Sequence, residues 1–152
     1  MIPYNGLYCL LDEDAQRQVL ERARQHLVPG GLLVFDGYSA DGFHADGEEG
    51  PAETAFVSRV SAEGVNWDVY ETSNWQKSGQ RIDAHYDHRP EGGGESVAAS
   101  IPQRYLLRAQ IEPLVESAGL EVLVVHGDFD QSVWDEDAPY LIVTAQRPSI
   151  EA

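Results

Sequence analysis

The sequence contains few cationic residues, a single cysteine and no long apolar run. Its 152 residues include ten Lys and Arg against 26 Asp and Glu, which gives a formal net charge of −16. A field of this sign repels polyanions, so we expect no nucleic-acid partner. Cys9 stands alone, which excludes an internal disulfide framework. Because no stretch approaches the ~18 apolar residues of a membrane helix, we predict no membrane partner and a cytoplasmic location.

Recognisable metal and catalytic motifs are also missing. His85 and His88 are three residues apart in a predicted strand, so their side chains point to opposite faces. The serines lack the G-x-S-x-G context of an activated nucleophile. The glycine-rich segment 91–96 lies between two predicted strands and not before a helix, which makes it a loop and not a phosphate site. The residues by themselves identify no metal site and no catalytic residue.

A helix followed by a buried strand is the clearest pattern in the first third of the chain. Apolar residues recur at helical spacing over about residues 13–28, and Pro29 and two glycines end the helix. Residues 32–35 are apolar without alternation, as expected of a strand covered on both faces. Ligands of open α/β sheets bind beyond the carboxyl ends of such strands, which directs attention to Asp36 and Tyr38.

Alternating apolar and polar residues with turn signals predict an antiparallel insertion at about 54–103. Three strands and a short fourth one are expected there, with Val65, Trp67 and Val69 on a covered face. A helix over residues 108–118 follows, whose first turn Pro113 makes irregular. Two further apolar strands then form a hairpin. The whole is predicted to be one α/β domain, residues 1–152.

The order of these segments carries a family resemblance. The landmarks are Pro29-Gly30-Gly31 with the strand to Asp36, Arg104-Tyr105, Ala118-Gly119, Gly127-Asp128 and the opening MIPYNGLYCLL. In this order they resemble the C-terminal half of S-adenosylmethionine-dependent methyltransferases of class I. The resemblance implies a partial Rossmann-like sheet, consisting of the fifth strand and a C-terminal antiparallel hairpin, with an inserted antiparallel β meander.

The resemblance also implies a function and a set of site residues. The function is methyl transfer from S-adenosylmethionine to a small-molecule substrate, with no catalytic residue assigned. The implied site residues are Pro3, Tyr4 and Asn5 beside the cofactor, and Asp36, Tyr38 and Arg104 beside the substrate. From the residues alone, each assignment has an alternative. Residues 3–5 can be an ordinary turn, Asp36 and Tyr38 a solvated strand end, and Arg104 a member of a surface or interface salt bridge.

Two cofactor-binding features of the family have no counterpart in the sequence. They are the glycine-rich loop after the first strand and the acidic residue that ends the second strand. We therefore expect the isolated chain not to bind S-adenosylmethionine with useful affinity. A non-catalytic module derived from a methyltransferase, and one half of a split enzyme, remain as alternative functions.

An exposed sheet edge is the last expectation. In the complete fold a fourth strand pairs with residues 32–35, and here at most its final residues are present. The helix over 13–28 loses part of the sheet that it covers, so we expect Val19, Leu20 and Leu27 to meet water. An unpaired apolar edge invites pairing with another chain. We predict a homodimer or higher oligomer that buries residues 1–10 and 32–36.

Overall fold

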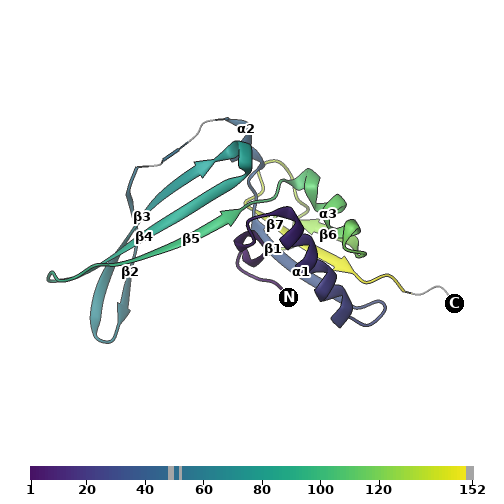
Figure 1. Ribbon diagram of the computed structural model, residues 1–152, viewed down its shortest axis with the longest axis horizontal. Helices are drawn as coiled ribbons and strands as arrows, with labels where there is room; N and C mark the ends of the chain where they lie inside the picture. Colours follow the sequence, from purple (N-terminus) through teal and green to yellow (C-terminus); the bar gives the residue numbers. More distant parts are fainter. Residues whose placement is uncertain (48–49, 52, 150–152) are drawn as a thin grey trace. The chain divides into compact units, whose positions relative to one another are not determined.

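The computed structural model describes residues 1–47, 50–51 and 53–149. The chain divides into two compact units (Figure 1). Unit 1 combines residues 1–47 with residues 104–152, and unit 2 spans residues 48–103.

Unit 1 contains both helices and strands. Its helices are η1 (Gly6–Cys9), α1 (Glu13–His26), α2 (Asp41–Ala45), η3 (Arg108–Gln110) and α3 (Ile111–Ser117). Its strands are β1 (Leu32–Tyr38), β6 (Glu121–His126) and β7 (Tyr140–Gln146). Unit 2 contains β2 (Ala55–Ala62), β3 (Val65–Gln76), η2 (Lys77–Gly79), β4 (Arg81–Pro90) and β5 (Val97–Arg104), the last of which reaches the boundary between the units.

The unit 1 sheet has the order β1-β7-β6, and β7 runs antiparallel to both neighbours. This confirms the predicted hairpin of the last two strands. The central strand is the most deeply buried, since Leu141, Val143 and Ala145 have almost no exposed surface. On its other side, β1 carries a single parallel bridge between Ile2 and Phe35. Strand β1 is therefore an edge strand to which one residue of the N-terminal segment is added.

Helix α1 begins at a side-chain cap. The carboxylate of Asp12 accepts a hydrogen bond from the N–H of Ala15 at 2.8 Å. The helix predicted over about 13–28 is confirmed, and it ends two residues early. The expectation that Leu20 meets water is wrong, because Leu20 is fully buried. Val19 and Leu27 are half-buried. The reason is that η1 and α3 pack against α1, so its apolar side is covered within unit 1.

Unit 2 is a four-stranded antiparallel sheet with the order β2-β3-β4-β5. The predicted antiparallel meander is thus confirmed, as a sheet separate from that of unit 1. Its first hairpin turns at Glu63 and Gly64, which both have positive φ (53° and 80°), as a tight two-residue turn requires. The predicted covered face is confirmed at Val69, which is buried, but is wrong for Val65. Val65 follows directly on the turn and is 38% exposed.

Candidate functional site

The N-terminal segment is hydrogen-bonded to the carboxyl end of β1. The N–H of Ile2 donates to the carbonyl oxygen of Val34 at 2.9 Å, and the N–H of Asp36 donates to the carbonyl oxygen of Ile2 at 3.3 Å. After this bridge the chain turns sharply. Tyr4 and Asn5 are consecutive left-handed residues, with φ of 57° and 55°. For a tyrosine this conformation costs about 1–2 kcal/mol, whereas an asparagine adopts it more readily, so contacts must hold the turn at Tyr4.

Two side chains hold this turn against β1. The Asp36 carboxylate accepts a hydrogen bond from the N–H of Tyr4, with distances of 3.2 and 3.1 Å to its two oxygens. In the opposite direction, the side-chain oxygen of Asn5 accepts a hydrogen bond from the N–H of Tyr38 at 2.9 Å. The structure therefore brings four predicted site residues together, Tyr4, Asn5, Asp36 and Tyr38, and Pro3 is the residue that enters the turn.

Tyr8 packs against Tyr38, which is one of these four residues. The Tyr8 hydroxyl donates to the carbonyl oxygen of Tyr38 at 3.1 Å, and the rings meet edge to face with centroids 5.1 Å apart. Burial raises the pKa of both phenols above the ordinary value, and at Tyr8 the neighbouring Tyr38 adds to the effect. Both hydroxyls therefore stay protonated at neutral pH and act as neutral hydrogen-bonding groups.

Helix α2 is joined to the segment that follows β5 by two side-chain contacts. His44 Nδ1 lies 2.8 Å from the hydroxyl of the buried Tyr105, and the Asp41 carboxylate accepts from the N–H of Arg108 at 3.0 Å. The Arg108 guanidinium also lies over the Trp134 ring, 5.7 Å from its centroid. Sequence reasoning missed His44 and Trp134. Nothing in their local pattern indicates these contacts, because every partner is more than 25 residues away.

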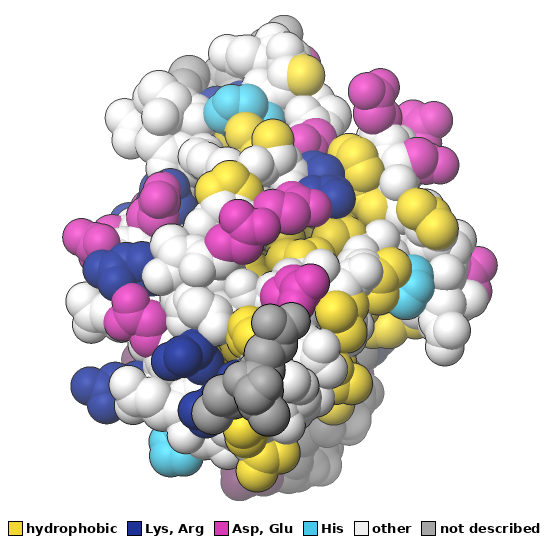
Figure 2. Space-filling view, turned by 90° about the vertical axis from the view of Figure 1, so that its right-hand side faces the viewer, with side chains coloured by type: hydrophobic (Ala, Val, Ile, Leu, Met, Phe, Trp, Pro, Cys, Tyr) yellow, Lys and Arg dark blue, Asp and Glu magenta, His cyan; other side chains and the backbone are white. Residues whose placement is uncertain are grey.

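A cavity of about 450 Å³ opens beside α2. Its lining residues are Asp41, Gly42, Ala45, Trp134, Glu136 and Asp137, all of unit 1. Three of these carry a carboxylate. Acidic side chains also lie among hydrophobic ones on the face drawn in Figure 2.

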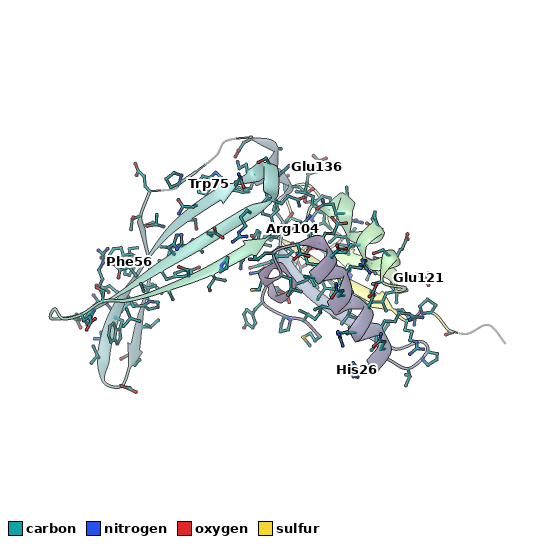
Figure 3. All side chains as sticks on the ribbon, viewed as in Figure 1. His26, Phe56, Trp75, Arg104, Glu121 and Glu136 are labelled. Atoms are coloured by element: carbon teal, nitrogen blue, oxygen red, sulfur yellow. The ribbon has the colours of Figure 1, made fainter. Side chains whose placement is uncertain are left out.

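Arg104 lies in a different environment from the other predicted substrate residues. Arg104 is labelled in Figure 3. Its guanidinium donates to the side-chain oxygen of Gln16 at 2.8 Å and lies 3.4 Å from the carboxylate of Glu13. Gln16 is fully buried and returns a hydrogen bond to the carbonyl oxygen of Arg104 at 3.0 Å. These contacts belong to the first turns of α1, whereas Asp36 and Tyr38 contact residues 4, 5 and 8. The structure does not join Arg104 to the corner formed by Tyr4, Asn5, Asp36 and Tyr38.

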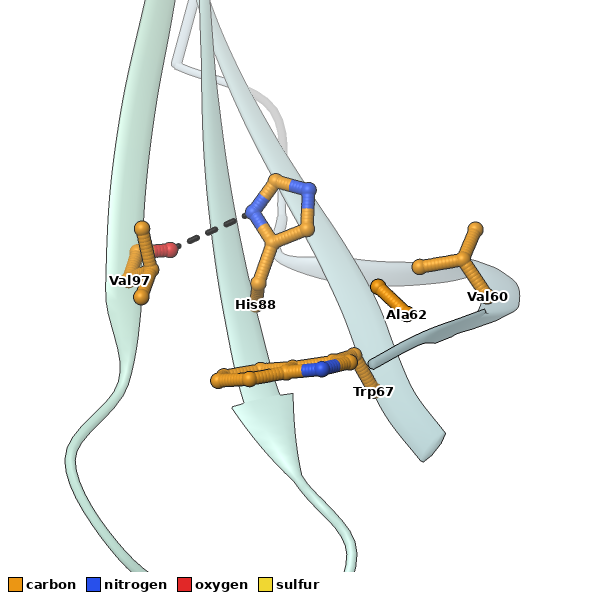
Figure 4. A pocket seen from close by; sticks show the side chains of 5 residues that line it. All are labelled: Val60, Ala62, Trp67, His88 and Val97. Carbon is orange, nitrogen blue, oxygen red and sulfur yellow. Dashed lines mark hydrogen bonds between the residues drawn. The ribbon is translucent and has the colours of Figure 1, made fainter. Parts of the chain in front are cut away.

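A second, smaller cavity lies on the sheet of unit 2. It has a volume of about 220 Å³ and is lined by Val60, Ala62, Trp67, His88 and Val97 (Figure 4). His88 Nδ1 lies 3.2 Å from the carbonyl oxygen of Val97, so this nitrogen carries the proton and donates. The other lining groups are apolar, and this site offers a hydrophobic surface with one imidazole.

In the part of the chain that the structure describes, no three His, Cys, Asp or Glu side chains are grouped as a metal site would require. No helix within the described ranges is both long and apolar enough to span a bilayer.

Comparison with known proteins gives matches among solved structures. No protein-family model and no curated protein sequence matches the chain. The CcbJ methyltransferase from Streptomyces caelestis is 27% identical, with a TM-score of 0.78, and the match covers 95% of this chain and 58% of that enzyme. The chain has the fold of the C-terminal half of a class I methyltransferase. It therefore spans little more than half the length of the enzyme that it resembles.

Two further methyltransferase structures show the same fold. An S-adenosylmethionine-dependent methyltransferase from Clostridium acetobutylicum is 11% identical, with a TM-score of 0.73 over 97% of this chain and 56% of its own. CalS10 from Micromonospora echinaspora, an amino pentose methyltransferase with S-adenosylmethionine bound, is 17% identical, with a TM-score of 0.63 over 95% of this chain and 55% of its own. Both matches extend over nearly the whole chain and so include residues of both units.

Proposed function

We propose that this chain is the substrate-side part of an S-adenosylmethionine-dependent methyltransferase that acts on a small molecule. The observation that supports this most is the corner at the carboxyl end of β1, where residues 2–5 return to Asp36 and Tyr38. In open α/β sheets this end of a strand is where ligands bind. The matched CalS10 enzyme acts on an amino pentose, which supports a small-molecule substrate.

In this proposal some residues of the corner face the cofactor and others face the substrate. Pro3, Tyr4 and Asn5 form the wall next to the cofactor, and Asp36 and Tyr38 form the end of β1 on the substrate side. Arg104 binds an anionic group of the substrate in place of the Glu13 carboxylate. The contact between Arg104 and Glu13 is long, at 3.4 Å, and the Glu13 side chain is 67% exposed.

The described residues supply one wall of a site for S-adenosylmethionine and not the whole site. The corner offers an exposed aromatic ring and a turn whose backbone is already hydrogen-bonded. Within the described residues no glycine-rich turn links a strand to the N-terminus of a long helix, so the cofactor contacts that such a turn would make are not supplied here. When bound, the cofactor supplies the electrophilic methyl group. This chain's share is to orient the substrate nucleophile, which is worth several orders of magnitude in rate.

We further propose that both units belong to one methyltransferase domain in which residues 54–103 are an insertion, and that the chain associates through the edge of β1. One residue, Ile2, pairs with this edge on the side away from β7. Leu32 beside it is 53% exposed, and Met1 and Val28 are also exposed. A second copy of the chain is the partner that this proposal names. A separate chain carrying the cofactor-binding half is the alternative partner, because the match covers 58% and 56% of the two enzymes.

A fusion protein tests the proposed function. The part of the CcbJ methyltransferase that lies outside the match is joined to the N-terminus of this chain, and S-adenosylmethionine binding is measured by calorimetry. We expect the fusion to bind the cofactor and to transfer radioactive methyl groups to members of a panel of amino and hydroxyl compounds. The control is the same fusion with Tyr4→Ala and Asn5→Ala. A folded fusion that binds the cofactor but methylates nothing in the panel favours the non-catalytic module.

A further inference from the structure

Tyr4 has a costly backbone conformation and almost no packing to compensate for it. Its φ of 57° lies in the left-handed region, where a bulky side chain is a genuine outlier. Its side chain is 89% exposed, so burial of the ring does not stabilise the turn. Strained residues of this kind persist only when their surroundings hold them, and they concentrate at functional sites. Another group must therefore hold Tyr4 in this conformation.

The contacts of the turn point to Asp36. Both oxygens of its carboxylate lie within 3.2 Å of the Tyr4 nitrogen, which makes this a hydrogen bond to a charged acceptor. The second link, from the N–H of Tyr38 to Asn5, forms only when the chain has already turned at Tyr4. The third, from the N–H of Gly6 to the carbonyl oxygen of Pro3 at 3.1 Å, closes the turn locally. Asp36 alone among these ties the strained residue itself to β1.

We propose that Asp36 is a positioning residue. Its carboxylate holds Tyr4 in the left-handed conformation, and the turn so formed presents the Tyr4 ring to the ligand and brings Asn5 onto Tyr38. Asp36 thus acts on the ligand through Tyr4 and not by touching it. The identity of the ligand rests on the proposed function, whereas the link between Asp36 and Tyr4 does not.

The variant Tyr4→Gly distinguishes a positioning role of Asp36 from a general contribution of Asp36 to stability. A glycine adopts positive φ without steric cost, so the turn then needs no carboxylate to hold it. The four proteins to compare are the full chain, Asp36→Ala, Tyr4→Gly and the double variant. Glu116→Gln is the control, because Glu116 is an exposed acid on α3 of the same unit.

Hydrogen exchange of the Tyr38 amide, measured by NMR, reports whether Asn5 is in place. We expect Asp36→Ala to accelerate this exchange about tenfold or more, as the loss of a hydrogen bond to a charged group predicts. The double variant should exchange far more slowly than Asp36→Ala, and the control should match the unaltered chain. The Val143 amide, at the centre of the sheet, should be unchanged in all of them and so report that each protein is folded.

The proposal is wrong if Tyr38 exchange is unaffected by Asp36→Ala, or if Tyr4→Gly gives no rescue. If Asp36→Ala does not fold, Asp36→Asn takes its place, since the amide keeps the shape and removes the charge. The same variants placed in the fusion protein then test the ligand. A fusion that never binds S-adenosylmethionine, even unaltered, overturns the proposed function and leaves the exchange result to decide the role of Asp36.

Discussion

Gly37 lies so close to the ring of Tyr8 that any Cβ at position 37 would displace the ring. A Cβ added to Gly37 would lie 2.4 Å from Cζ of Tyr8. The Tyr8 ring is buried against β1 and donates its hydroxyl to the next residue, Tyr38. The glycine in the strand-end segment Asp36-Gly37-Tyr38 is thus required by the tyrosine of η1, 29 positions earlier in the chain.

The first prediction concerns this contact. Gly37→Ala should destabilise the chain by about 1–3 kcal/mol, because the Tyr8 ring must move out of a packed position. Urea denaturation measures the change. The control is Gly42→Ala in α2, where an added Cβ has no atom within 4 Å and helix propensity favours alanine. Equal stability of the two variants would contradict the packing argument.

The second prediction concerns the buried amide of Gln16. This side chain donates towards the carbonyl oxygens of Leu7, Leu10 and Arg104 and accepts from the Arg104 guanidinium. Gln16→Leu should cost about 2–3 kcal/mol, since buried acceptors and a guanidinium lose a partner. Gln18→Leu, at an exposed position of the same helix, is the matched control for thermal or urea unfolding and should change stability little.

The third prediction is that the isolated chain has no useful affinity for S-adenosylmethionine. The reason is that this chain carries one wall of the proposed site, and that its described residues hold no glycine-rich turn between a strand and the N-terminus of a long helix. Calorimetric titration of the purified chain measures this directly. Tight binding would show that the residues present are sufficient and would make the fusion unnecessary.

The fourth prediction is association through the edge of β1. Light scattering should give the mass of a dimer or larger species, and Leu32→Lys should reduce it, because a lysine on an edge strand blocks pairing. Leu123→Lys is the control, as Leu123 is 48% exposed on β6, the opposite edge of the same sheet. A monomer at high concentration, or dissociation by the control variant alone, would contradict the proposed interface.

The fifth prediction is a pH dependence in the acid range. The Arg108 guanidinium beside Glu112 holds the pKa of that carboxyl below its ordinary value, since Arg108 Nη1 lies 2.5 Å from it. A lowered pKa in the folded state means that the contribution to stability is present above the ordinary pKa of the carboxyl and is lost as pH falls through the lowered one. Glu112→Gln should flatten this part of the stability curve. The effect is small, because the pair is partly exposed to solvent.

The local elements of the fold could be predicted because their causes are local. The cap at Asp12 and the spacing of apolar residues specify α1, and alternation specifies the strands of unit 2. Pro113 predicts an irregular first turn over residues 108–118, and the structure has the separate 3-10 helix η3 there. The hairpin of β6 and β7 followed from two consecutive apolar runs.

The burial of Leu20 and the contacts of Arg104 could not be predicted in this way. Helical spacing shows that Leu20 belongs to an apolar side of α1, but not that η1 and α3 cover that side. Arg104 pairs with a residue 88 positions away, and its partner Gln16 has no pattern that distinguishes it from a surface glutamine. Both outcomes depend on which segments the fold brings against α1.

Helices α1 and α3, the strands and the segment in which a site is expected follow from the sequence alone, because periodicity, caps and turn residues act within a few positions. Helices η1 and α2 do not, since they lie in segments whose turn residues and glycines predict loops. The contacts of Tyr4 and Asn5 with Asp36 and Tyr38 depend instead on the tertiary structure. Those contacts join side chains to backbone N–H groups more than 30 residues away, and they need a left-handed conformation at Tyr4, which a tyrosine disfavours. A conformation of that kind exists because the end of β1 supplies its hydrogen-bond partners, and no pattern in the local sequence encodes them.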